Sequence, residues 1–181
     1  MPIYARKKER EYSPAPEGLN SAVCCDVIDL GLIETGFGKQ EKIEIRWQLE
    51  EIDPKSHKRY LVPQRYTPSL HEKSKLRPLL ESWRGKKFSK EELKRFDIEK
   101  LIGANCQLSI VHNIKDEGEV YANVQAIVPP ARNAGKLYVD EDYVRVQDRP
   151  GYVPPMHEPE AYDKPNGAIQ QEEVGEDYVP F

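Results

Sequence analysis

Residues 42–50 alternate between polar and apolar side chains without a break. The apolar members, which would share one face of an extended chain, are Ile43, Ile45, Trp47 and Leu49. The polar members, which would share the other face, are Lys42, Glu44, Arg46 and Gln48. This period of two is typical of an antiparallel strand with one buried face, because successive side chains point to opposite sides of a sheet. The segment therefore predicts a β-sheet with a core on one side, and it places Trp47 in that core.

Four other segments carry strand signals, so five strands are predicted in all: 20–32, 42–50, 59–67, 106–111 and 120–128. Turn-forming residues separate neighbouring strands at 36–39, 53–56 and 115–118. Pro63 and Pro68 give the third strand the character of a sheet edge, because proline lacks the backbone donor that an inner strand needs.

Helix signals fill the gap between the third and fourth strands. Ser69 and Glu72 have the spacing of a capping box, and Pro78 should kink or shorten the helix that follows them. Ser89 and Glu92 repeat the capping pattern before a second, short helix. The apolar residues at helical spacing in the first helix, all expected in the core, are Leu76, Leu79, Leu80 and Trp83.

Three strands, a helical insert and two strands follow one another within residues 18–130. This order resembles the OB-fold, a five-stranded Greek-key barrel with its helix between the third and fourth strands. We therefore expect a mainly β domain of this type. Another small β-barrel with the same element order, such as an SH3-like barrel, is the alternative.

The charge of the chain is unevenly distributed. Residues 1–130 carry a balance of +2 and residues 131–181 a balance of −6, which together give the formal −4. The composition of residues 1–17 predicts a flexible basic arm. The composition of residues 131–171 predicts a linker that is partly ordered and then, from Pro150 on, disordered. Residues 172–181 form an acidic tip.

The chain ends in two acids, a tyrosine and three apolar residues: Glu176, Asp177, Tyr178, Val179, Pro180 and Phe181. This ending resembles the C-terminal tip of bacterial and phage single-stranded DNA-binding proteins, in which an acidic run precedes a short aliphatic residue, Pro and Phe. Tyr178 departs from the pattern, since an acid usually stands there. The resemblance implies that these six residues bind partner proteins, with the Phe ring in an apolar pocket and the terminal carboxylate paired with a basic side chain.

The family resemblance covers the element order of residues 18–130 and the terminal tip. It implies a protein that coats and protects single-stranded DNA, without strong sequence preference, during replication, recombination and repair. The expected partners are single-stranded DNA and, through the tip, a helicase, nuclease, primase or recombination mediator, with a homo-oligomer possible. The expected location is the cytoplasm, that of a bacterial host if a phage encodes the chain. The alternative is an OB-like adaptor of a replication or recombination complex with little DNA affinity of its own.

Binding of single strands without sequence choice requires cations for the phosphates and aromatic rings for the bases. The candidates on polar strand faces or at a hairpin tip are Phe37, Lys39, Lys42, Arg46, Tyr60, Arg65, Tyr66 and Tyr121. Tyr60 and Tyr66 share one parity of the third strand and Arg65 has the other, so one of the three is expected to be structural. A basic cluster beside the helical insert is expected to be a solvated face, with phosphate contact as the alternative: Lys86, Lys87, Lys90, Lys94 and Arg95.

The chain lacks the patterns of an enzyme, a metal site or a cofactor site, and a metal-dependent nuclease is the alternative, because carboxylate clusters leave weak marks in a sequence. Its histidines are scattered over a turn, a helix start, a strand and the tail: His57, His71, His112 and His157. No phosphate-binding fingerprint occurs, and the three cysteines lack the C-x-x-C spacing of a metal or redox site, which favours buried, reduced thiols. No apolar run approaches the ~18 residues of a membrane helix, so no membrane association is expected.

Overall fold

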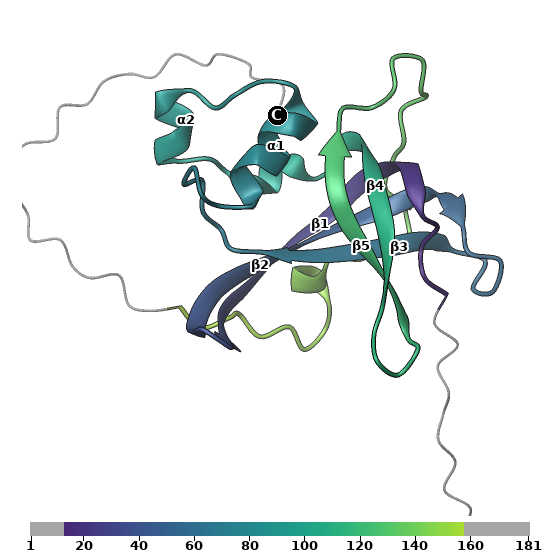
Figure 1. Ribbon diagram of the computed structural model, residues 1–181, viewed down its shortest axis with the longest axis horizontal. Helices are drawn as coiled ribbons and strands as arrows, with labels where there is room; N and C mark the ends of the chain where they lie inside the picture. Colours follow the sequence, from purple (N-terminus) through teal and green to yellow (C-terminus); the bar gives the residue numbers. More distant parts are fainter. Residues whose placement is uncertain (1–12, 158–181) are drawn as a thin grey trace, which may run out of the picture.

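The computed structural model describes residues 13–157, which form a mainly β domain (Figure 1). Its strands are β1 (Gly18–Thr35), β2 (Gly38–Ile52), β3 (Arg59–Tyr66), β4 (Asn105–Ile114) and β5 (Val120–Val128). They make one antiparallel sheet in the order β3-β2-β1-β4-β5. The expected five strands, with the helices between the third and fourth, are confirmed.

The alternation in β2 has the predicted consequence. Ile45, Trp47 and Leu49 are fully buried, and Trp47 lies 6.0 Å from Trp83 between ring centroids in the core beneath the sheet. β1 and β2 are longer than expected and form one hairpin that closes where Thr35 pairs with Gly38. Two irregularities in its register, at 24–26 and 29–31, let the long ribbon bend around the core.

β3 and β5 are the edge strands of this sheet. The edge position of β3 agrees with Pro63, which lies opposite Arg46 of β2 in the register. The two edges approach each other, because the backbone N–H of Val124 in β5 donates a hydrogen bond to Gln64 Oε1 of β3 at 3.4 Å.

The first helix starts later than Ser69 and Glu72 predict. α1 spans Leu76–Arg84, and Ser69 accepts a hydrogen bond from the backbone N–H of His71 in a turn instead. Pro78 explains the late start, because proline fits the first turn of a helix but cannot occupy its interior without losing a hydrogen bond. The predicted apolar face is nevertheless the buried one, with Leu76, Leu80 and Trp83 in the core.

A second, short helix is held to the end of the first by side-chain contacts. α2 (Lys90–Lys94) begins with the predicted capping box of Ser89 and Glu92. Glu92 Oε1 also accepts a hydrogen bond from Arg84 Nη2 at 2.7 Å, and the Arg84 guanidinium lies 4.7 Å from the centre of the Phe88 ring. A turn of 3-10 helix at Ile98–Leu101 then leads into β4.

The chain after β5 forms an ordered strap, which we define as residues 137–157. It runs across the β1–β2 hairpin on the side away from α1 (yellow-green in Figure 1) and includes one 3-10 turn at Val146–Asp148. The ordered part of the predicted linker thus extends beyond Pro150 to His157, whose imidazole lies 3.0 Å from an Asp29 carboxylate oxygen. The predicted basic arm, apart from residues 13–17, and the rest of the predicted linker lie outside the described residues.

The end of the strap is fitted to Gly31, which predicts the effect of one substitution. A Cβ at Gly31 would lie 2.3 Å from the Met156 carbonyl oxygen, at a backbone φ of +60°. We expect Gly31→Ala to lower the free energy of unfolding by about 2 kcal/mol, through backbone strain and the displaced strap. Urea denaturation measures this cost, with Gly36→Ala as the control because nothing lies within 4 Å of a Cβ there. Equal stability of the two variants would contradict the close fit.

No helix within residues 13–157 has the length and apolar character needed to span a membrane.

Candidate nucleic-acid interface

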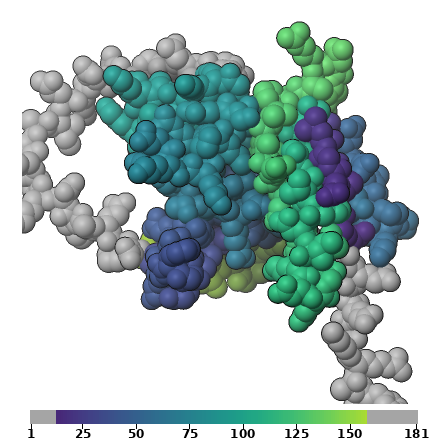
Figure 2. Space-filling view, in the orientation of Figure 1, coloured from purple at the N-terminus to yellow at the C-terminus, as the bar shows by residue number. Residues whose placement is uncertain are grey.

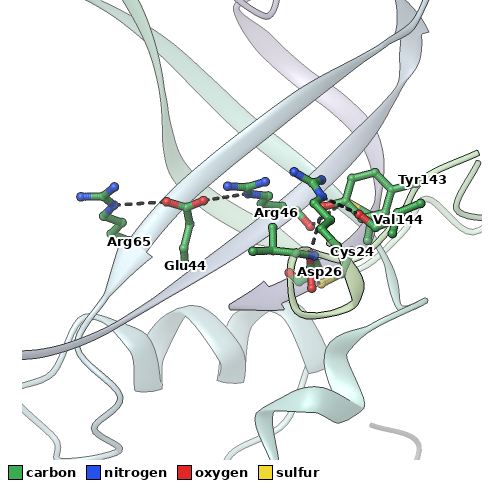
Figure 3. A network of polar contacts seen from close by, with 10 residues as sticks. Cys24, Asp26, Glu44, Arg46, Arg65, Tyr143 and Val144 are labelled. Carbon is green, nitrogen blue, oxygen red and sulfur yellow. Dashed lines mark hydrogen bonds and ion pairs between the residues drawn. The ribbon is translucent and has the colours of Figure 1, made fainter. Parts of the chain in front are cut away.

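The outer face of β2 and β3 carries a row of charged side chains. Glu44 of β2 lies between two guanidinium groups, 2.7 Å from Arg46 Nε and 3.2 Å from Arg65 Nε (Figure 3). Arg65 is the residue opposite Glu44 in the β2–β3 register, so the pairing follows directly from the sheet. Lys42 Nζ donates a hydrogen bond to Thr67 Oγ1 at the end of this row.

The row keeps a positive charge although it contains an acid. Glu44 balances one of the two guanidinium groups, and the Arg65 side chain remains 63% exposed against 22% for Arg46. Burial alone would lower the pKa of Arg46, but its hydrogen bond to Glu44 and the charge of that carboxylate raise it. Arg65 is therefore the cation of this face that a phosphate can reach most easily.

The strap covers the neighbouring part of the outer face. Asp26 of β1 is buried and accepts hydrogen bonds from Tyr143 Oη at 3.1 Å, Arg145 Nε at 3.1 Å and the Val146 N–H at 2.8 Å. Figure 3 shows this cluster beside Arg46, and Asp26 and Arg46 are partners in the β1–β2 register. The strap therefore leaves the Arg65 side as the more exposed part of the row.

A second set of contacts fixes the start of the strap over the same sheet. Asp140 accepts a hydrogen bond from Arg59 Nη1 at 3.2 Å, and its backbone N–H donates to Gln48 Oε1 at 2.9 Å. Arg59 Nε donates to the Leu49 carbonyl oxygen at 2.6 Å. Arg59 is thus a structural cation.

Sequence reasoning missed the residues that hold the strap, yet it offered a signal for them. Asp26 is an acid between Cys25 and Val27 in an otherwise apolar stretch. A buried carboxylate requires hydrogen-bond donors, so a charge in such a stretch implies that another segment supplies them. Tyr143 and Arg145, two positions apart, are those donors.

The tip of the β1–β2 hairpin presents an exposed aromatic ring. Phe37 is 94% exposed, and its backbone N–H donates a hydrogen bond to Thr35 Oγ1 at 3.2 Å. The same hydroxyl donates to the Gly38 carbonyl oxygen at 2.7 Å, so the turn is held from both sides. Lys39, also exposed, follows directly. This tip combines a ring with a cation, as the sequence predicted.

The β4–β5 hairpin carries the last candidate. Tyr121 lies half-buried opposite Asn113, its hydroxyl donates a hydrogen bond to Glu119, and Lys115 Nζ lies 4.4 Å above its ring. Figure 2 shows the two hairpins as separate lobes, dark blue and green, at the lower edge of the molecule. The aromatic candidates Phe37 and Tyr121 thus belong to different lobes.

Two of the third-strand candidates face the core. Tyr66 is only 7% exposed and belongs to the core, and burial raises the pKa of its hydroxyl above the usual range. The prediction that Tyr66 contacts DNA needs correction, because a buried ring offers no open face to a base. Tyr60 shares its parity and packs partly against the core, whereas Arg65 points outward. Of the three third-strand candidates, one was expected to be structural, and the structure shows that Tyr66 has this role.

Within residues 13–157, no group of three or more His, Cys, Asp or Glu side chains could hold a metal ion. The three cysteines are free and buried, and burial raises the pKa of Cys25 to about 12, so this thiol stays protonated at neutral pH. The predicted partner-binding residues 176–181 lie outside the described residues.

Comparison of the sequence with protein-family models gives no match, and comparison with curated proteins gives no significant match.

Proposed function

We propose that the chain binds single-stranded DNA without strong sequence preference, as a protein of DNA replication, recombination and repair. The DNA would contact the Arg65 side of the β2–β3 face and the two hairpin tips. Phosphates would meet Lys39, Lys42 and Arg65, while bases would stack on Phe37 and Tyr121. Arg46 would act mainly by sharing the charge of Glu44, whereas Tyr60, on the core-facing side of β3, would not contact the DNA directly.

The OB-type barrel is part of this proposal. The order β3-β2-β1-β4-β5 is the one that a five-stranded OB barrel has when it is opened between its third and fifth strands. The hydrogen bond from Val124 to Gln64 joins those two edges. An OB barrel binds oligonucleotides on its second and third strands and the loops beside them, which here include Phe37 and Arg65.

The observation that carries the proposal is the exposure of Phe37. A phenyl ring 94% exposed on a turn held by Thr35 cannot contribute to the core, and it stands beside Lys39. Such a ring is suited to stacking on a base, and base–aromatic stacking contributes ~1–3 kcal/mol per base.

The terminal residues 176–181 would recruit partner proteins. The support is chemical: two acids and a terminal carboxylate suit a basic rim, and Phe181 suits an apolar pocket. The adaptor with little DNA affinity is the second candidate. It is favoured by Glu44, which offsets one cation of the β2–β3 face, and by the strap, which occupies Arg59 and Gln48.

Alanine at Phe37 tests the stacking role. We expect Phe37→Ala to weaken binding to oligo-dT by about 5- to 150-fold, the factor that corresponds to one lost stacking contact. The control is Leu19→Ala, which removes another exposed apolar side chain, 59% exposed and far along β1 from the hairpin tip. Fluorescence anisotropy with labelled oligo-dT measures both. Equal affinities of the two variants would rule out stacking on Phe37.

A further inference from the structure

Two hollows follow one another along the seam between α1 and β5. The first, about 470 Å³, is lined among others by Arg65, Lys75, Ser82 and Ile127. The second, about 780 Å³, begins at the next residues of the same elements, Trp83 in α1 and Pro129 after β5. We call this second hollow, with its rim of Lys86, Lys100, Arg132 and Lys136, the basic groove. Figure 2 shows the helical segment (blue-green) against the green strands along this seam.

We propose that the basic groove is a second binding site for the phosphate backbone of single-stranded DNA. The inference rests on the proposed function and extends it. The strand would leave the hairpin surface at Arg65, follow the α1–β5 seam and reach the cations of the groove.

The seam differs in charge from two other hollows of the described surface. No carboxylate lines either seam hollow, and the cations among their lining residues are Arg65, Lys75, Arg84, Lys86, Lys100, Arg132 and Lys136. The hollow beside the β1–β2 hairpin contains Asp29, Asp97 and Glu99, and the one under the strap contains Asp140 and Asp142. In a chain with a formal charge of −4, a seam lined by several cations and no carboxylate is a local feature that suits a linear polyanion.

The base of the groove is packed, and the segment that carries part of its rim is hydrogen-bonded to that base. Trp83 is buried and its Nε1 donates to the Asn105 carbonyl oxygen at 2.9 Å, while the Arg84 side chain is only 1% exposed and paired with Glu92. Asn105 also binds the backbone of Leu137 through both of its side-chain atoms, at 2.9 and 2.6 Å. This contact fixes the segment that carries Arg132 and Lys136.

The lining chemistry favours backbone contact without base recognition. The Trp83 ring is 2% exposed, so it offers no stacking surface, whereas Lys86, Lys100, Arg132 and Lys136 are all exposed. Cations without rings neutralise phosphates whatever the sequence. The groove lies one strand length from the tip of the β4–β5 hairpin, along β5. An oligonucleotide must therefore be long enough to reach both.

The test uses the full chain with Lys100, Arg132 and Lys136 replaced together by alanine, and labelled oligo-dT of about 8 and about 30 nucleotides. The short length lies within the ~4–16 nucleotides that one OB domain binds, and the long one exceeds that range. We expect the variant to bind the long oligonucleotide at least tenfold more weakly and the short one within twofold of wild type. The slope of log affinity against log salt should fall by about 2, because each phosphate contact on a single strand contributes about 0.7.

The control replaces three exposed lysines elsewhere by alanine: Lys55, Lys58 and Lys73. It changes the net charge by the same amount as the groove variant. Equal losses in both triple variants would overturn the groove as a site, since net charge alone would explain them. An unchanged affinity of the groove variant would also overturn it. If that variant instead lost binding of a synthetic peptide of residues 175–181, the groove would be a dock for acidic peptide. Absence of wild-type binding at either length would refute the proposed function itself, a different result from failure of the groove alone.

Discussion

Replacement of Asp26 by alanine is expected to lower the free energy of unfolding by about 3 kcal/mol and to release the strap. The carboxylate is 1% exposed and accepts hydrogen bonds from Tyr143, Arg145 and Val146. Removal of one partner from a buried pair costs ~3–5 kcal/mol, because the remaining charge and donors lose their compensation. We expect a loss of unfolding free energy at the lower end of this range, since Arg145 keeps its 2.8 Å contact with Glu99.

Urea denaturation measures the loss of stability, and limited trypsin digestion reports the release of the strap through cleavage after Arg145. Asp142→Ala is the matched control, because its ion pair with Lys58 has side chains 73% and 75% exposed. Exposed pairs contribute ~0–1 kcal/mol. An Asp26 variant as stable and as protease-resistant as the Asp142 variant would show that the strap is held by other contacts.

Replacement of Glu92 by glutamine is expected to lower the free energy of unfolding by about 2 kcal/mol. Glu92 pairs with Arg84, whose side chain is 1% exposed, and it closes the capping box by accepting from the Ser89 N–H at 2.8 Å. Breaking a fully buried pair costs ~3–5 kcal/mol, but Glu92 itself is 23% exposed, so water partly compensates the loss. Glutamine keeps the size of the side chain, so the variant measures the effect of removing the negative charge alone.

The same variant has a defined pH dependence. The hydrogen bonds from Arg84 and from the Ser89 N–H lower the pKa of Glu92 to about 2. A lowered pKa stabilises the folded state above the unfolded-state pKa of about 4.3, and this contribution is lost as the pH falls toward 2. The difference in unfolding free energy between wild type and Glu92→Gln should therefore narrow between pH 4.5 and 2. Urea denaturation at pH 7 and pH 3 tests this, and a constant difference would contradict the pairing.

The β-sheet was predictable because its signals are local. The alternation in residues 42–50 placed Trp47 in the core, and Pro63 marked an edge strand, because each depends on the geometry of a single strand. The predicted start of α1 was wrong for an equally local reason. The Ser69–Glu72 spacing satisfied a capping rule, but Pro78 could be accommodated only in the first turn, so the helix begins at Leu76.

The strap and the role of Tyr66 depend on contacts far apart in the sequence. Tyr66 shares its parity with Val62, and its burial was decided by the helical segment that packs beneath β3. Residues 143–146 alternate as a short strand would, but the strap contains no strand, and it is held by side chains that contact Asp26 more than a hundred residues earlier in the sequence. The groove cations Lys100 and Lys136 are likewise brought together only by the packed fold.

The central claim is that the chain binds single-stranded DNA, and titration of the full-length protein against labelled oligo-dT of about 30 nucleotides tests it most directly. Anisotropy should be recorded across a range of salt, with a matched duplex alongside. The account predicts a strong preference for the single strand and an affinity that falls steeply as salt rises. Absence of binding at low salt, or equal binding of the duplex, would contradict it.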